Sequence, residues 1–178
     1  MRDIEANGLR LAVYAPEHDV QTIEWLNDPA LQQGFGLARQ VTLDSHRAWR
    51  EAHGEILMWA VMDDSGAHCG NLLLHPAVAR RSAYLQVYIG RHASRRQGIA
   101  FRALSGVLDY AFNTLGLHRV WLHTLPGNMP AEGLYEKLGF VKEGVEREAL
   151  PRGKEFVDQF RWSLLDQEWR ASSKGRVK

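Results

Sequence analysis

The sequence lacks the features that define several protein classes. Its 178 residues include one cysteine, Cys69, so a disulfide framework is excluded and a reducing compartment is favoured. The formal net charge of +1 is too small for the basic face of a nucleic-acid-binding protein. No apolar run approaches the ~20 residues of a membrane helix, and the first residues are too charged for a secretion signal. We therefore expect a cytoplasmic protein with neither nucleic acid nor membrane as a partner.

Metal-binding and common nucleotide-binding signatures are also missing. The eight histidines show no metal-ligand spacing, so no metal site is predicted. Neither the G-x-G-x-x-G motif of dinucleotide-binding proteins nor the glycine-lysine-serine/threonine end of a P-loop is present. These absences exclude a Rossmann dehydrogenase and a P-loop NTPase. Cys69, at the start of a predicted strand, is interpreted as a small buried apolar residue rather than a nucleophile.

What remains is the pattern of one ordinary globular domain. Hydrophobic residues make up 45% and charged residues 24% of the chain, which is typical of soluble domains. The length allows one sizeable core, so we predict a single domain over 1–170 and a disordered tail over 171–178.

Hydrophobic periodicity and turn residues predict the order of the elements. The predicted strands are 10–14, 56–62, 69–75, 82–90 and 118–125, followed by a closing hairpin around the sequence PRGK, and the predicted helices are 18–27, a short one from Asp44 to Gly54, 97–115 and 128–140. This order predicts an α+β fold, a mostly antiparallel twisted sheet with helices on both faces. The unit 82–90, 97–115 and 118–125 is expected to form a central parallel, right-handed βαβ crossover.

A glycine at the start of the long helix suggests an anion site. Gly98 is expected in the first turn, where glycine costs about 1 kcal/mol relative to alanine. The first turn of a helix offers unpaired N–H groups and a partial positive charge, and small residues allow a diphosphate close to the backbone. Arg95 and Arg96 add positive charge. Taken alone, a solvated basic turn explains this segment equally well.

Two motifs at the right spacing decide between these interpretations. The first reads RRQGIA from Arg95 to Ala100, and the second reads NMPAEGLYEKLGF from Asn128 to Phe140. Together they resemble the GNAT superfamily of acetyl-CoA-dependent N-acetyltransferases, whose pyrophosphate motif has the form [Q/R]-x-x-G-x-[G/A]. The element order and the closing RGKEFVDQFRWSLL hairpin are similar to the branch of ribosomal-protein N-terminal and spermidine acetyltransferases. The resemblance covers about residues 70–165 and implies the GNAT acyltransferase fold.

The resemblance implies acetyl-CoA as co-substrate, without a metal. It assigns the pantetheine arm to the strand backbone and the pyrophosphate to the helix start, through Val87, Tyr88, Ile89, Arg95, Arg96, Gln97, Gly98, Ile99 and Ala100. Asn128 matches the asparagine that hydrogen-bonds the pantetheine arm. It also suits a helix N-cap, and both roles are compatible.

The resemblance also implies catalytic residues. Tyr135 matches the tyrosine that protonates the departing thiolate, a task that suits a phenol with a pKa near 10. Its alternative role is that of a core tyrosine on an apolar helix face. His123 is the candidate base, directly or through water, and His75 is a weaker one; for either, a structural role is the alternative. Tyr84 stands where many members of this branch carry a glutamate, with the strand alignment uncertain by one residue.

The acceptor amine is predicted from a lack of acidic residues. The segment 30–42 contains no acid and one arginine, Arg39, whereas a polyamine would call for carboxylates. Without the strand glutamate, an α-amine with a pKa of about 7.7–8.0 is a more suitable acceptor than a lysine-like amine at about 10.4. A protein or peptide N-terminus is therefore expected, with Phe35, Arg39 and Tyr84 lining its site. For the loop residues, an ordinary surface loop is an equal alternative.

Two other functions and the assembly state stay open at this point. The first alternative is an acetyltransferase of a small molecule such as an amino sugar, polyamine or aminoglycoside. The second is a non-catalytic CoA-binding module, which the presence of Tyr135 disfavours. A homodimer is compatible with the sequence and is not demanded by it.

Overall fold

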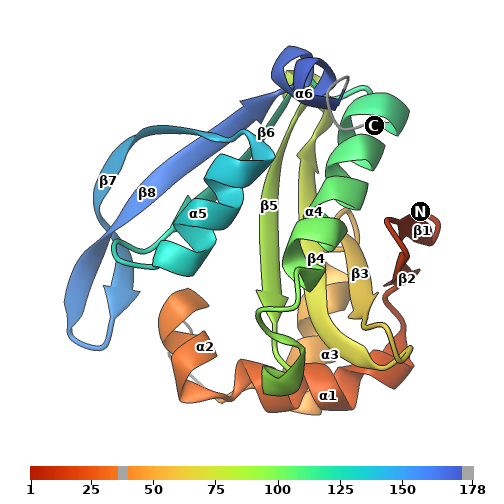
Figure 1. The fold of residues 1–178 in the computed structure, drawn as a ribbon. Coiled ribbons are helices and arrows are strands. Elements are labelled where there is room, and N and C mark those ends of the chain that lie inside the picture. The colour runs from red at the N-terminus through yellow and green to blue at the C-terminus, as the bar shows by residue number, and fades with distance from the viewer. Residues whose placement is uncertain (36–39, 174–178) are drawn as a thin grey trace. The chain divides into compact units, whose positions relative to one another are not determined.

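The computed structural model describes residues 1–35 and 40–173, and it divides into two compact units. The first comprises Met1–His75 and Gln86–Gly106, and the second comprises Pro76–Leu85 and Val107–Lys178. Figure 1 labels their helices and strands. The single domain expected over 1–170 stays a prediction.

The first unit contains the N-terminal strands and three helices. Its elements are β1 (Ile4–Ala6), β2 (Leu9–Val13), the 3₁₀ turn η1 (Pro16–His18), α1 (Asp19–Leu26), α2 (Pro29–Phe35), α3 (Leu43–Ala52), β3 (Leu57–Met62), most of β4 (His68–Ala77), the end of β5 (Ser82–Ile89), the 3₁₀ turn η3 (His92–Ser94) and the start of α4 (Ile99–Asp109). The strand order is β1-β2-β3-β4-β5, and the pairs from β1 to β4 are antiparallel.

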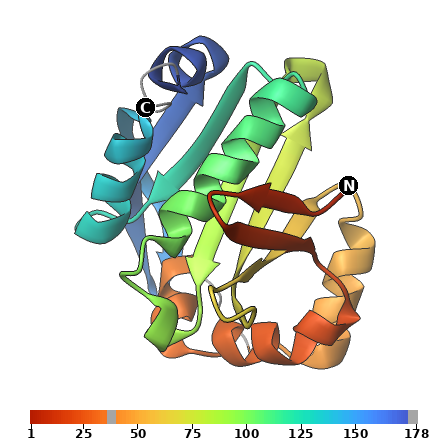
Figure 2. The same cartoon turned by 45° about the vertical axis from the view of Figure 1, so that its right-hand side comes forward.

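The strand expected over 10–14 is the second half of a hairpin that the periodicity did not reveal. Asn7 and Gly8 connect β1 to β2 with φ angles of 51° and 73°, the left-handed values that a two-residue hairpin turn demands. Figure 2 shows this hairpin in dark red beside α4. Gly106 of α4 lies against Ala6 there, because a Cβ at Gly106 would collide with the Ala6 methyl group.

The segment expected to be a loop over 30–42 is partly helical. Helix α2 begins at Pro29, a residue that suits the first turn of a helix because its missing N–H needs no partner there. The Asp28 carboxylate accepts a hydrogen bond from the Ala30 N–H at 2.8 Å. Phe35 is the last residue of α2. Arg39 lies outside the described residues.

The long helix begins two residues later than expected. Gly98 has a φ of +72°, so it precedes the helix, and its carbonyl accepts the Arg102 N–H at 3.1 Å. Glycine is favoured at this position because the left-handed conformation burdens any residue with a Cβ. After Asp109 the helix continues as a π-helical stretch, η4 (Tyr110–Thr114).

The second unit contains the C-terminal strands. Its elements are the start of β5, the 3₁₀ turn η2 (Val78–Arg80), the end of α4, η4, β6 (Arg119–Thr124), α5 (Met129–Leu138), β7 (Val141–Arg152), β8 (Glu155–Leu165) and α6 (Asp166–Ser173). The strand order is β5-β6-β8-β7. Residues 82–84 pair in parallel with 119–121, and the other two pairs are antiparallel. The predicted α+β class with its parallel crossover strands is therefore confirmed.

Strand β6 has one buried face and one half-buried face. Val120, Leu122 and Thr124 are buried, and the Trp162 Nε1–H of β8 donates to Thr124 Oγ1 at 3.0 Å. Trp121 and His123 alternate with them and are half-buried on the opposite face. Helix α6 takes in residues 171–173 of the tail that was expected to be disordered.

Candidate functional site

The loop before α4 is anchored by one carboxylate. Asp63, in the turn after β3, accepts hydrogen bonds from Ser94 Oγ and Arg91 Nη1, both at 3.1 Å. Hydrogen bonds, foremost that from the Ser65 hydroxyl, lower the pKa of Asp63 to about 2. Asp63 is therefore charged at neutral pH and holds the loop to the turn.

Arg95 is committed to the same loop. Its Nε and Nη2 donate to the carbonyl oxygens of Ile89 and Gly90, at 2.9 and 3.3 Å. The guanidinium therefore fixes the path of the chain as it leaves β5. Arg96 is exposed and has a φ of +61°.

The turn from Gln97 to Ala100 fits a bound anion. A Cβ placed on Gly98 would have no atom within 4 Å, so the backbone there is openly accessible. Ile99 and Ala100 begin an α-helix of 11 residues, whose first N–H groups have no partner within the helix. Neutral backbone donors at the positive end of a helix are able to bind an anion.

The end of β5 is tied to β4 and α1 through a buried amide. The Asn71 Nδ2 donates to Tyr88 Oη at 2.7 Å and to Thr22 Oγ1 at 2.8 Å. Tyr88 and its neighbours Val87 and Ile89 are half-buried in the strand.

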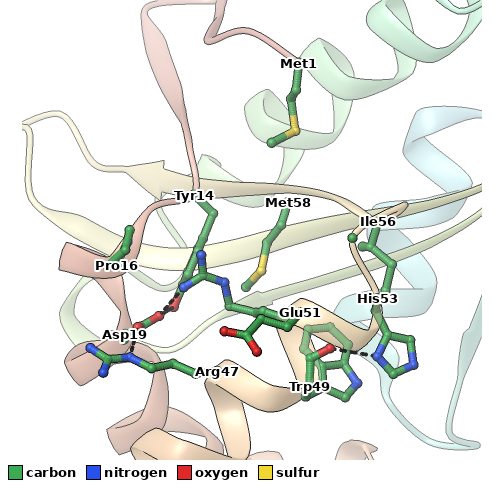
Figure 3. A pocket seen from close by; sticks show the side chains of 12 residues that line it. Met1, Tyr14, Pro16, Asp19, Arg47, Trp49, Glu51, His53, Ile56 and Met58 are labelled. Atoms are coloured by element: carbon green, nitrogen blue, oxygen red, sulfur yellow. Dashed lines mark hydrogen bonds and ion pairs between the residues drawn. The ribbon is translucent and has the colours of Figure 1, made fainter.

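The first unit holds two cavities that share part of α3. One, of about 520 Å³, is drawn in Figure 3. The other, of about 500 Å³, lies between the helices and the ends of β3, β4 and β5. Trp49, His53, Ile56 and Met58 line both.

The cavity of Figure 3 contains a buried ionic network. Asp19, with 1% of its side chain exposed, accepts from Tyr14 Oη at 3.2 Å and from Arg50 Nη1 at 2.7 Å. Arg47 Nε lies at 3.4 Å from the same carboxylate, and His46 Nε2 at 3.5 Å. Arg47 and Arg50 therefore both form ion pairs with Asp19.

Tyr135 lies in the interior of the second unit. Its exposed fraction is 6%, and its ring lies 5.7 Å from that of Phe140 and 6.2 Å from that of Trp162. Burial raises the pKa of the Tyr135 phenol well above its usual value. The phenol is therefore protonated at physiological pH, as an exposed tyrosine also is, and burial makes it a weaker acid. The same packing would also serve a core tyrosine.

His123 is part of a cluster that the sequence did not reveal. Its Nε2 lies 2.9 Å from Oε2 of Glu146 on β7, and the other oxygen of that carboxylate lies 2.9 Å from Arg161 Nε. Neither contact has the alignment of a hydrogen bond. Burial lowers the pKa of His123, against an opposing effect of Glu146.

Aromatic rings border this cluster. The Tyr84 ring centroid lies 4.6 Å from that of Trp121 and 5.5 Å from that of His123. The Arg161 guanidinium lies 4.5 Å above the Trp121 ring. His123 therefore has an aromatic side and an acidic side.

Asn128 acts as the N-cap of α5. Its Oδ1 accepts from the Ala131 N–H at 3.4 Å, and its side chain is exposed. The expected αL cap at the other end is Gly139, with a φ of +95°.

The predicted site residues that the structure describes are divided between the two units. The first unit carries Val87, Tyr88, Ile89 and the turn 95–100, and the second carries Tyr84, His123, Asn128 and Tyr135. Within the second set, Tyr84 and His123 are in contact. Glu146 and Arg161 are the additions to the sequence prediction.

Across the part of the chain that the structure describes, no three metal-ligating side chains gather at one point. No helix in that part is long and apolar enough to cross a membrane.

The described chain thus has a parallel β5–β6 pair, a glycine turn before α4 and a tyrosine on α5. Residues 9–141 match the model of the "Acetyltransferase (GNAT) domain" family. The chain belongs to this family.

Similar proteins match this chain over part of their length. A spermidine N(1)-acetyltransferase of Vibrio cholerae is 41% identical over 64 residues, 36% of this chain and 36% of its own. A [ribosomal protein uS5]-alanine N-acetyltransferase of Escherichia coli is 26% identical over 92 residues, 50% of this chain and 47% of its own. In these matches the chain spans half or less of the relatives' length.

Solved structures match over nearly the whole chain. A spermidine N-acetyltransferase from Vibrio cholerae in complex with CoA and spermine has a TM-score of 0.84 at 23% identity, covering 92% of this chain and 98% of that one. This likeness shows that the chain shares the fold of that solved structure.

Proposed function

We propose that this protein transfers an acetyl group from acetyl-CoA to a primary amine by direct attack, with a protein or peptide N-terminus as the acceptor. The observation that carries the proposal is the buried Tyr135 within the NMPAEGLYEKLGF motif of an established family member. Acetyl-CoA supplies the activated acetyl group as co-substrate. Tyr135 donates the proton that the leaving thiolate needs.

The base in this proposal is His123. Because burial lowers the pKa of His123, its imidazole is neutral and able to accept a proton at neutral pH. The Glu146 carboxylate at 2.9 Å stabilises the imidazolium that forms. This dyad stands in for the strand glutamate that Tyr84 replaces.

The cofactor part of the proposal assigns the pyrophosphate to the Gln97–Ala100 turn. The open backbone at Gly98 and the start of an 11-residue helix directly after it support this assignment. Arg96 adds charge from its exposed position, whereas Arg95 acts by shaping the loop. Val87, Tyr88, Ile89 and Asn128 are assigned to the pantetheine arm.

A polyamine is the second candidate acceptor, because the 41% identical Vibrio cholerae relative is a spermidine acetyltransferase. The test is acetyl-CoA turnover against N-terminal peptides, polyamines, amino sugars and aminoglycosides. We expect the lowest Michaelis constant for a peptide. Clear preference for spermidine would replace the peptide, and a protein that binds CoA without turnover of any amine would be a CoA-binding module.

A further inference from the structure

We propose that the cavity of Figure 3 binds the zwitterion of a free α-amino acid with an apolar side chain. The cavity lies wholly within the first unit, because every residue that lines it belongs to the segment Met1–His75. Such an amino acid is a ligand additional to acetyl-CoA and to the amine acceptor.

Helix α3 carries a carboxylate without a cationic partner at this cavity. Glu51 follows Arg47 by four residues, a spacing at which opposite charges can pair on a helix. Arg47 and Arg50 instead both contact Asp19 of α1, through Nε at 3.4 Å and Nη1 at 2.7 Å. Among the described residues, the exposed Glu51 carboxylate has no ion pair or hydrogen bond. Two cations therefore share one buried anion, and a second anion is left free.

The Arg50 guanidinium is held in place with hydrogen-bond donors unused. It donates to Asp19 and lies 4.9 Å above the Tyr14 ring, and 26% of its side chain is exposed. Its Nε and Nη2 groups have no acceptor among the described residues, and the same holds for both Nη groups of Arg47, whose side chain is 52% exposed. A carboxylate of a ligand can accept two parallel hydrogen bonds from such a guanidinium.

Apolar and aromatic groups form another part of the cavity wall. Met58 is buried, and Figure 3 shows its side chain between the ionic network and Ile56. The rings of Trp49 and His53 are stacked, with centroids 5.0 Å apart and planes 25° from parallel. The volume of about 520 Å³ lies within the ~300–1,000 Å³ of small-molecule sites. An aliphatic side chain therefore finds apolar contacts beside the charged groups.

The charges of the cavity favour a zwitterion over an anion or a polycation. The charged side chains that line it are two carboxylates and two guanidiniums, so their formal charges sum to zero. A simple anion would meet the free carboxylate of Glu51, and a polycation would meet two arginines. Glu51 would hold the amine as an ammonium, which has no lone pair to attack a thioester. The amino acid is therefore a bound ligand at this site and not an acetyl acceptor.

Calorimetry on the full chain with L-leucine, glycine, N-acetylleucine and leucinamide tests this site. We expect leucine to bind and each of the other three compounds to bind at least about tenfold more weakly. Glycine lacks the apolar side chain, and the two derivatives each lack one of the charges. Acetyl-CoA turnover with leucine as the only amine should stay at the background rate.

Two substitutions assign the charges of the ligand to the protein. Glu51→Gln should weaken leucine binding about tenfold and leave N-acetylleucine unaffected, because that compound has no ammonium. Arg47→Gln should weaken leucine binding about tenfold and leave leucinamide unaffected, because that compound has no carboxylate. Both residues are exposed, so we expect both variants to fold, which thermal unfolding checks. Glu55→Gln is the matched control, because Glu55 is exposed in the next segment and does not line the cavity.

Three results would overturn the inference, and the binding measurements among them do not depend on whether any amine is acetylated. One is the absence of leucine binding at millimolar concentration. Another is equal affinity of the unchanged protein for leucine, N-acetylleucine and leucinamide. The third is turnover of leucine that Glu51→Gln abolishes, because the cavity would then hold an acceptor.

Discussion

The carboxylate of Glu146 lies 2.9 Å from His123 and 2.9 Å from Arg161, so one acidic group on β7 contacts two basic side chains on two other strands. His123 and Arg161 are direct partners in the pairing of β6 with β8. The three side chains therefore share one face of the sheet in the second unit.

Changing Glu146 to glutamine should move the pH dependence of turnover. Glu146 raises the pKa of His123, so its loss lowers that pKa further below the ordinary value. A base works in its neutral form, and the acidic fall in kcat/KM should therefore move to lower pH. Profiles of kcat/KM against pH measure this, with Glu143→Gln as the control because Glu143 contacts Arg119 and Ser163 instead. If the fall of kcat/KM at acidic pH does not move in Glu146→Gln, His123 is not the base.

Removing the Tyr135 hydroxyl should abolish most turnover without unfolding the protein. Tyr135→Phe keeps the ring that packs near Trp162, so the cofactor should still bind. General acid catalysis contributes about 10²–10⁴-fold, which is the expected loss in kcat. Tyr110→Phe, which removes a phenol from the π-helical stretch, should keep its activity. Full activity of a folded Tyr135→Phe variant would leave Tyr135 a packing residue only.

An aspartate in the turn before α4 should weaken CoA binding. Like charges at about 4 Å repel by ~1 kcal/mol even in bulk water, so Gly98→Asp should reduce CoA affinity at least about fivefold. Gly153→Asp controls for backbone strain, because Gly153 has a similar φ of +66° and equally open surroundings in the turn between β7 and β8. Calorimetry should find that the two variants are comparably destabilised and that only Gly98→Asp binds CoA more weakly. Equal CoA affinity in the two variants would mean that the pyrophosphate binds elsewhere.

The stability of the protein in acid should depend on Asp63. Its pKa is lowered to about 2 in the folded chain, so its stabilising contribution is complete above pH 3.8, the ordinary value, and is lost as the pH falls through about 2. Asp63→Asn should therefore unfold at a lower urea concentration at pH 7. Its free energy of unfolding should also depend less on pH between pH 4 and pH 2. Asp64→Asn, which removes an exposed partner of Arg102, should change little. If the free energy of unfolding falls with pH in the same way for Asp63→Asn and for the unchanged protein, Asp63 does not have this role.

Local sequence was sufficient for the elements whose pattern is long. The strands around β3, β5 and β6, the crossover helix and the αL cap at Gly139 all follow from periodicity and glycine placement. The β1 strand has three residues, too few for any periodicity, although Asn7-Gly8 is a hairpin signal. Helix α2 was missed because its seven residues, PALQQGF, are too few for a clear apolar periodicity and include a glycine, and because a neighbouring carboxylate helps to begin the helix.

The position of Glu146 could not be read from the sequence for a different reason. The pairing of β7 with β8 shifts by one residue between Lys142 and Gly144. Such a bulge reverses which residues face each side of the sheet. Glu146, rather than Val145, therefore reaches the side of His123. A one-residue register shift depends on the partner strand, and no local pattern in β7 encodes it.

The ion pairs that anchor the loop before α4 affect how strongly CoA association depends on ionic strength. Arg91 and Arg102 face Asp63 and Asp64, and Arg95 donates to backbone carbonyls. The charges of Arg91 and Arg102 are thus locally balanced, and only part of the positive charge in this part of the chain extends into solvent to attract a distant polyanion. Association with CoA then depends more on short-range contacts with the backbone than on long-range attraction. Its rate should fall only weakly between dilute buffer and physiological salt, where the Debye length is about 8 Å.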